Sequence, residues 1–268
     1  MRDIVYENER IRMSIPLSVV VVAKNEEANI DECLGSVFGW AGEIVVVDDE
    51  STDRTAALTR KYTDKIYHRK MDVEGTHRNW AYAQASNEWV LSLDADERLT
   101  QELRDEISAV LVEPEYQLYT IPRRNYIGDY WVRYGGQYPS AQLRLFRKEC
   151  FRYEETYVHP RVFLTGTTGH LKSDLLHYSY RDFGHFLQKL NAQTTMEARK
   201  WVEDKRKATF GKSLWRSIDR FFRGYVRKQG YKDGFIGFMV AYFSSIYQVI
   251  SYAKYWQMKQ KNVMTGKG

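Results

Sequence analysis

The stretch that decides the fold is LSVVVVA, residues 17–23. An apolar run this rich in valine is too short for a buried helix, and it predicts a strand covered on both faces. The runs EIVVVD at 43–48 and WVLSLD at 89–94 repeat the pattern, and 65–68 is a weaker strand between them. Helical patterns lie between and after these strands, at residues 28–38, 53–62 and 75–86 and after Thr100. This alternation predicts an α/β protein with a mostly parallel sheet and helices on both faces.

Acidic residues follow two of the predicted strands. Asp48 and Asp49 end the strand at 43–48, and Asp94 and Asp96 end the strand at 89–94. Because ligands of such sheets bind at the carboxyl ends of the strands, we expect both clusters to face one crevice. Neighbouring carboxylates repel each other, which implies a cation, and hard oxygen ligands select Mg²⁺ or Mn²⁺. The alternative is that these residues form surface turns, but clusters at two strand ends favour the metal.

The pattern changes after residue 116. Extended segments interrupted by arginines, glycines and aromatic residues lie at 116–125, 142–148 and 174–180. They predict a mixed or antiparallel extension of the first sheet. Residues 182–207 then have the pattern of one long helix.

The composition excludes several classes of protein. The chain of 268 residues is 43% hydrophobic and 28% charged, which is typical of a globular protein rather than a disordered one. Its two cysteines, Cys33 and Cys150, exclude a disulfide scaffold and a four-cysteine zinc site, and they fit a reducing compartment. The aromatic share of 15% supplies amphipathic rings for a sugar-binding surface, an interface or a membrane boundary.

Positive charge is concentrated near the C-terminus. Residues 199–232 hold twelve Lys or Arg and three acidic residues, a local charge of +9 in a chain of net charge +5. Within 214–226, apolar residues repeat at helical spacing with arginines on the other side, as in an interfacial helix on an anionic membrane. Residues 234–253 then carry no charge. This stretch predicts a monotopic membrane contact, with a membrane span and a core or dimer helix as alternatives.

The motifs together resemble a known family. The order SVVVVAKNEEANI (18–30), EIVVVDDESTDRT (43–55), THRNWAYAQA (76–85) and WVLSLDADE (89–97) resembles glycosyltransferase family 2. The closer similarity is to the bacterial lipopolysaccharide-core β-1,4-glucosyltransferases, over about residues 16–200. The resemblance implies the GT-A fold, a Rossmann-like mixed sheet. It divides the chain into a glycosyltransferase domain at 1–207, with a nucleotide-sugar half (16–115) and an acceptor half (116–207), and a basic helical extension at 208–268.

The resemblance also implies roles for individual residues. The nucleotide-sugar donor would be bound by residues at strand ends, on a helix and in a glycine loop. These residues are Ala23, Asn25, Glu26, Asp48, Asp49, Arg78, Asn79, Asp94, Gly135 and Gly136. The metal that bridges the diphosphate would be held by Asp96, Asp94 and His177, although a histidine on a strand is also explained as a core residue. Arg123, Arg124 and Arg144 form either a solvated face or a site for acceptor phosphates, which Arg matches bidentately.

One departure from the family pattern concerns the general base. Related enzymes carry an acidic residue directly after the histidine of the motif read here as Tyr157-Val158-His159-Pro160, and Pro160 cannot act as a base. An inverting transfer needs a base for the proton of the acceptor hydroxyl. His159 and Glu155 are the rival candidates.

These observations predict a metal-dependent, inverting hexosyltransferase. It would move glucose from UDP-glucose to a lipid-linked or lipopolysaccharide-core glycan, at the cytoplasmic face of the cell membrane. An alternative is transfer to a polyprenyl phosphate, whose anionic oxygen needs no base. An alternative of another class is a non-catalytic basic protein that binds membranes or RNA. The carboxylate clusters argue against nucleic acid as a partner, because they repel its phosphates.

Overall fold

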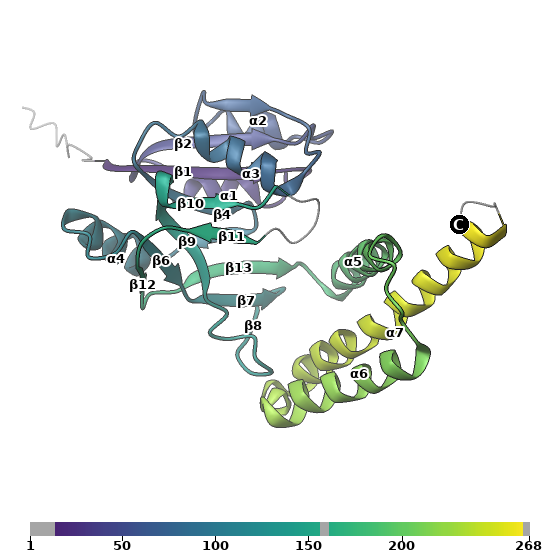
Figure 1. Cartoon of the computed structure of the whole chain (residues 1–268). Helices are drawn as coiled ribbons and strands as arrows, with labels where there is room; N and C mark the ends of the chain where they lie inside the picture. Colours follow the sequence, from purple (N-terminus) through teal and green to yellow (C-terminus); the bar gives the residue numbers. More distant parts are fainter. Residues whose placement is uncertain (1–13, 156–160, 265–268) are drawn as a thin grey trace, which may run out of the picture. The chain divides into compact units, whose positions relative to one another are not determined.

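The computed structural model describes residues 14–155 and 161–264, and Figure 1 shows the course of the chain. Contacts within the chain define two compact units. The first consists of residues up to Pro122 together with Ala141–Leu176, and the second consists of Arg123–Ser140 together with the chain from His177 onward. These divisions differ from the boundary expected after residue 207, which stays a prediction.

A seven-stranded sheet forms the centre of the first unit, with the strand order β12-β6-β9-β4-β1-β2-β3. The strands β3, β2, β1 and β4 run parallel to one another, β9 is antiparallel to β4 and β6, and β12 is parallel to β6. Its strands are β1 (Ile15–Ala23), β2 (Ala41–Asp48), β3 (Ile66–His68), β4 (Trp89–Asp94), β6 (Leu118–Ile121), β9 (Gln142–Arg147) and β12 (Thr168–His170). The predicted mixed, mostly parallel sheet is confirmed.

Both faces of this sheet are covered, which explains the apolar runs in the middle of its central strands, such as Val19–Val22 of β1 and Ile44–Val47 of β2. On one face, Val19 and Val21 of β1 pack with α1 (Ile30–Gly35) and α4 (Gln101–Val112). On the other face, Val20 packs with residues of α3 (Glu74–Ala83). Thr100 caps α4 as predicted, because its hydroxyl accepts a hydrogen bond from the amide of Leu103.

The remaining elements of the first unit are short. They are α2 (Thr55–Thr59), β5 (Glu97–Leu99), η1 (Lys148–Cys150), β10 (Phe151–Tyr153) and β11 (Val162–Leu164). The strands β10 and β11 form a two-stranded ribbon that flanks residues 156–160.

The second unit combines a small sheet with three long helices. The strands β7 (Arg123–Ile127) and β8 (Tyr130–Val132) form an antiparallel hairpin, and β13 (Leu175–Tyr180), most of which belongs to this unit, is the neighbour of β7. The helices are α5 (Phe183–Glu203), α6 (Phe210–Phe222) and α7 (Gly234–Met264), and the turns η2 (Arg223–Arg227) and η3 (Gly230–Asp233) join α6 to α7. The helix expected at 182–207 is confirmed as α5, with Asp182 as its cap.

Small residues let α6 and α7 pack closely, and Figure 1 shows the two helices side by side. Ser213 and Ser217 of α6 are buried, and the Ser217 hydroxyl donates to the carbonyl of Ser245. The Cα of Gly224 allows contact with Ala241, since an added Cβ would lie 3.9 Å from the Ala241 methyl group. By length and composition, one stretch in the described part of the chain, Gly230–Gln260, is long and apolar enough to cross a membrane.

Candidate active site

Strand register brings the two acidic clusters to one edge of the sheet. The strand β1 lies between β2 and β4, and its last residues pair with both: Ala23 is opposite Asp48, and Val22 is opposite Asp94. The two clusters therefore flank the carboxyl end of β1, as the sequence predicts. This edge is where α/β sheets bind their ligands.

Asp94 is the centre of a network of ionic side chains. Arg144, on β9, donates to the Asp94 carboxylate and to Glu97, the latter with an N–O distance of 2.6 Å. Arg78, on α3, approaches the other oxygen of Asp94 at 3.3 Å. Glu97 is fully buried, and it also accepts a hydrogen bond from the Asp94 amide at 2.9 Å. The network joins β4, β9 and α3 around one carboxylate.

This network fixes the charges of its members. Burial alone raises the pKa of Asp94, but the charges of Arg144 and Arg78 outweigh it and hold that pKa well below its usual range. Burial alone lowers the pKa of Arg144, but the carboxylates of Asp94 and Glu97 outweigh it and raise that pKa well above the ordinary value. Asp94 is therefore ionised and held in one orientation at neutral pH.

Asp96 is the residue predicted to hold a cation. It lies two residues beyond Asp94 and is 9% exposed. Within residues 14–155 and 161–264, no group of three or more acidic, His or Cys side chains converges as a complete metal cage. Mg²⁺ and Mn²⁺ commonly take one or two carboxylates together with substrate phosphates, so this donor set fits a metal bound jointly with a diphosphate.

Asp48 and Asp49 are held by neighbours at the end of β2. Asp48 contacts the His68 ring nitrogen at 3.0 Å, and its second oxygen is buried without a hydrogen-bond partner in the described residues. Asp49 accepts from Lys24 at 3.1 Å and from the Met71 amide at 2.7 Å. An unsatisfied buried carboxylate oxygen is uncommon in folded proteins and is typical of a functional site.

The loop after β1 has a constrained backbone. Asn25 has a φ of 54°, a conformation that few residues other than Gly and Asn adopt readily. Its side-chain oxygen accepts from the Thr52 amide at 2.8 Å, and the Glu26 amide donates to the Thr55 hydroxyl at 2.8 Å. These bonds hold the loops after β1 and β2 together, so the predicted donor residues at 23–26 and 48–49 lie in one place.

The amide of Asn79 supports the strand that leads into residues 156–160. It donates to the carbonyl of Tyr153 at 2.9 Å and accepts from the Tyr153 amide at 2.8 Å. Glu155 pairs with Arg152 and is half-exposed. The rival base His159 lies outside the described residues, as does Pro160.

The other predicted site residues belong to the second unit. His177 Nδ1 contacts the Asn125 side-chain oxygen at 2.7 Å, and Asn125 Nδ2 donates to the Gln137 carbonyl at 2.7 Å. The Ser179 hydroxyl lies 2.8 Å from the same Nδ1, and in the tautomer that donates from Nδ1 to Asn125 the lone pair of the ring is on Nε2. Gly135 and Gly136 have φ values of 69° and 80°, which favour glycine.

The three arginines expected at the acceptor have different surroundings. Arg144 is 7% exposed within the Asp94 network, which suits it to orienting Asp94. Arg124 lies over the Trp131 ring at 4.5 Å, and Arg123 precedes it on β7. Their role at an acceptor stays a prediction.

Sequence reasoning missed two members of the site. Glu97 stands in the quoted run Asp94-Ala95-Asp96-Glu97 without a role, and its partner Arg144 is 47 residues away, so no local signal identifies the pair. His68 ends the weak strand β3 and contacts Asp48. Its position at a strand end beside another acidic strand end is the signal that identifies it.

The fold and site define a class of protein, the α/β enzymes whose acidic strand ends bind a nucleotide. The model of glycosyl transferase family 2 matches residues 18–165. The chain is 30% identical to the lipopolysaccharide core biosynthesis glycosyltransferase LpsC of Rhizobium meliloti, over 91% of this chain and 93% of that protein. It is 26% identical to an uncharacterized glycosyltransferase of Rickettsia typhi, over 92% and 90% of the two chains. The chain belongs to glycosyltransferase family 2, and it is a glycosyltransferase.

Among solved structures, the chain is similar to Staphylococcus aureus TarS 1–349 in complex with UDP-GlcNAc, with a TM-score of 0.47, 16% identity, and coverage of 94% and 92% of the two chains. The family membership excludes the alternative of a non-catalytic membrane- or RNA-binding protein.

Proposed function

We propose that the protein is a metal-dependent, inverting hexosyltransferase that transfers glucose from UDP-glucose to a lipid-linked or lipopolysaccharide-core glycan. The observation that carries the proposal is the pair of acidic strand ends around β1, with Asp94 fixed by two arginines and Asp96 beside it. The similarity to LpsC, named for lipopolysaccharide core biosynthesis, supports the acceptor class.

The residues divide the work of binding the donor. Asp48, Asp49 and the loop at 23–26 hold the nucleoside end of the donor, since they lie at the carboxyl ends of β2 and β1. Asp96, with His177 as the second candidate ligand, holds the cation, and Arg78 orients Asp94 beside it. A bound Mg²⁺ or Mn²⁺ neutralises the diphosphate leaving group. In the tautomer that donates from Nδ1 to Asn125, the lone pair of His177 is on Nε2, the arrangement that a metal-ligating histidine requires.

Transfer forms a bond between the acceptor oxygen and the anomeric carbon while the bond from that carbon to the diphosphate breaks. A base must take the proton of the acceptor hydroxyl. Glu155 and His159 are the candidates, and Glu155 is exposed enough to meet an acceptor. Glu154 is a weaker candidate, because its pairing with Arg161 lowers the pKa of its carboxyl.

A second candidate acceptor is a polyprenyl phosphate. Pro160 stands where related enzymes carry an acidic residue, and this absence favours the second candidate. A phosphate oxygen is already anionic and needs no general base.

We also propose that the protein acts at the cytoplasmic face of the cell membrane, bound through α6 and α7. Eleven of the exposed large apolar residues lie on these helices and the turns between them: Phe210, Leu214, Trp215, Ile218, Phe222, Val226, Tyr231, Phe235, Phe238, Tyr242 and Trp256. Apolar residues gathered on one pair of helices with a basic surround are typical of an interfacial membrane contact.

A screen of nucleotide sugars tests the function. The full-length protein is melted with each nucleotide sugar in the presence and absence of Mn²⁺, since a bound donor stabilises the folded state by mass action. UDP-glucose with Mn²⁺ is expected to give the largest rise in melting temperature, and release of UDP on addition of a lipopolysaccharide-core acceptor completes the test. The proposal is contradicted if none of the UDP-sugars raises the melting temperature, or if the rise does not depend on Mn²⁺.

A further inference from the structure

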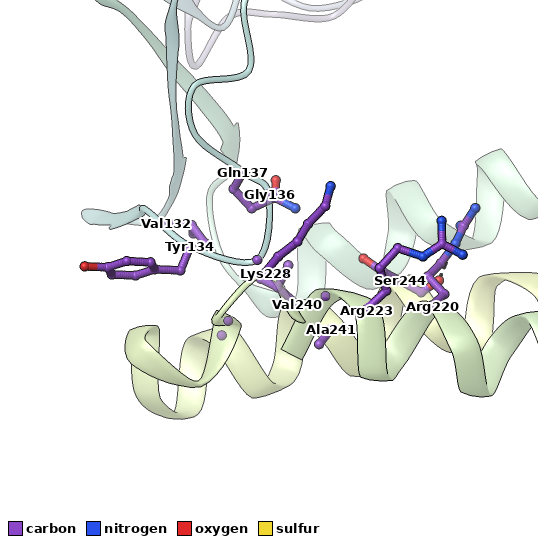
Figure 2. Close-up of a pocket in the computed structure, with 14 residues that line it drawn as sticks. Val132, Tyr134, Gly136, Gln137, Arg220, Arg223, Lys228, Val240, Ala241 and Ser244 are labelled. Carbon is purple, nitrogen blue, oxygen red and sulfur yellow. Dashed lines mark hydrogen bonds between the residues drawn. The ribbon is translucent and has the colours of Figure 1, made fainter. Parts of the chain in front are cut away.

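A basic cavity lies within the second unit. It has a volume of about 290 Å³ and is lined by residues of the loop after β8, the turns η2 and η3, and the facing sides of α6 and α7. Figure 2 shows Lys228 extending alongside Gly136, with Arg220 and Arg223 projecting from the helical pair on the same side. No acidic side chain is among the described residues that line it.

The charge of this cavity is only partly compensated. Arg223 pairs with Asp219 of the preceding turn. Arg220 donates to the carbonyl of Ser244 at 3.4 Å and lies over the Tyr247 ring at 5.8 Å. Within residues 14–155 and 161–264, no carboxylate forms an ion pair with Lys228 or Arg220. Two positive charges therefore remain for a ligand.

Gly136 makes the position of Lys228 possible. A Cβ added to Gly136 would lie 2.6 Å from both Cδ and Nζ of Lys228, so any other residue would displace the ammonium group. The backbone of Lys228 is fixed as well, because its carbonyl accepts from the Gly135 amide at 2.9 Å. The backbone of Lys228 is thus held at the glycine loop, and its side chain lies against Gly136.

Asp233, the last residue of η3, fixes the loop after β8 to the connection between α6 and α7. It is buried and accepts from the Tyr134 amide at 2.8 Å, the Arg133 amide at 3.4 Å and the Tyr130 hydroxyl at 3.2 Å. These bonds pin the start of the glycine loop to the end of η3. The backbone on this side of the cavity is therefore fixed before a ligand binds, which lowers the entropy cost of binding.

We propose that this cavity binds a phosphate monoester. Such a group carries a charge of about −1.5 to −2 at neutral pH, which matches the two uncompensated cations, and its oxygens suit the guanidinium fork of Arg220. A single carboxylate would leave one cation unpaired. The phosphate is either a substituent of the glycan acceptor or the headgroup of a lipid. The inference rests on the proposed function only for the first source, the glycan acceptor.

Binding measured without transfer tests the site. Glucose 6-phosphate is titrated into the full-length protein by calorimetry, and vesicles containing phosphatidic acid are tested separately by co-sedimentation. Lys228→Ala is expected to weaken binding of the phosphate probe on the order of 10-fold or more, the loss of one charge-assisted hydrogen bond. Arg220→Ala is expected to weaken it similarly.

Arg227→Ala is the matched control, because Arg227 is an exposed cation of the same turn that does not line the cavity. An effect of Lys228→Ala on glucose 6-phosphate identifies a glycan phosphate, and an effect on phosphatidic acid vesicles alone identifies a lipid headgroup. Equal losses in Arg227→Ala, or no phosphate binding in either arm, would overturn the site. Weaker UDP binding in Lys228→Ala would assign the cavity to the donor instead. If the wild-type protein binds no UDP-sugar but does bind the phosphate probe, the proposed function is contradicted and this site is not.

Discussion

Arg144 is buried against Asp94, and it bonds to Glu97 with the same guanidinium nitrogen. The pairing joins β9, which runs antiparallel, to the carboxyl end of β4, which carries the aspartates predicted to bind the nucleotide sugar and the metal. The Asp94 carboxylate is thus oriented by a buried cation, and this arrangement keeps Asp94 ionised and fixed in place.

Removal of Arg144 is expected to destabilise the protein strongly. Arg144→Ala removes a buried cation from Glu97, which is fully buried, and leaves Asp94 with Arg78 alone, and such a loss costs about 3–5 kcal/mol of the free energy of unfolding. Arg147→Ala on the same strand is the control, because its partner Glu88 is exposed and such pairs contribute about 1 kcal/mol or less. Urea unfolding of both variants measures the difference. Equal losses would show that the Asp94 network does not support the fold.

Asp96→Asn is expected to abolish Mn²⁺-dependent binding of UDP while the melting temperature without ligand stays near that of the wild type. The amide lacks the negative charge that a hard cation requires. Asp105→Asn, an exposed residue of α4, is the matched control. Calorimetry with UDP, with and without Mn²⁺, measures the effect. Wild-type affinity in Asp96→Asn would remove Asp96 from the metal site.

The general base is identified by variants that bind the donor with unchanged affinity but turn over more slowly. If His159 takes the acceptor proton, His159→Ala lowers turnover on the order of 10²–10⁴-fold, and if Glu155 does so, Glu155→Gln has that effect. Glu154→Gln is the control, since the Glu154 carboxylate is bound to Arg161. Wild-type turnover in all three variants would favour the anionic polyprenyl phosphate acceptor.

Glu43 predicts a loss of stability in acid. Burial raises the pKa of Glu43, but hydrogen bonds from Lys65, Ser18 and Ser86 outweigh it and lower that pKa to about 2. A carboxyl whose pKa is depressed on folding stabilises the protein fully above its unfolded pKa, and this contribution falls as the pH drops through the folded value. The free energy of unfolding is expected to fall by about 3 kcal/mol between about pH 5 and pH 2 on account of Glu43.

Glu43→Gln tests this assignment, because it is expected to be less stable at neutral pH and to lose that part of the acid dependence. Urea unfolding across this pH range measures both. Glu43 lies near the start of β2, at the end of the sheet opposite Asp48, so UDP affinity at neutral pH is expected to be unchanged. An unaltered acid profile in Glu43→Gln would place the titrating group elsewhere.

The sequence predicts those features that depend on local pattern. Val19 and Val20 point to opposite faces and are both buried, so an unbroken apolar run identifies the central strand. The D-x-D run at residues 94–96 likewise identifies the end of β4 as a candidate site. Arg144 and Asp94 are fifty residues apart, and Lys228 meets Gly136 across a longer separation, so neither pairing has a local signal. Asn79 was expected at the donor, yet both ends of its amide bind the backbone of Tyr153.

Membrane binding is expected to depend on the exposed aromatic residues of α6. Trp215 is 69% exposed and Phe222 is 56% exposed, so replacing both with Ser leaves the core of the protein intact. Burial of each ring in the interface contributes about 1.5–3 kcal/mol, and the double variant is therefore expected to bind anionic vesicles at least about 100-fold more weakly. Phe38→Ser is the control, because Phe38 is 49% exposed but belongs to the first unit. Co-sedimentation with vesicles and a melting curve are measured together. If the double variant still pellets like the wild type, α6 does not contact the membrane. If it melts much earlier instead, these rings are covered in the folded protein and α6 is part of an interface between copies of the chain.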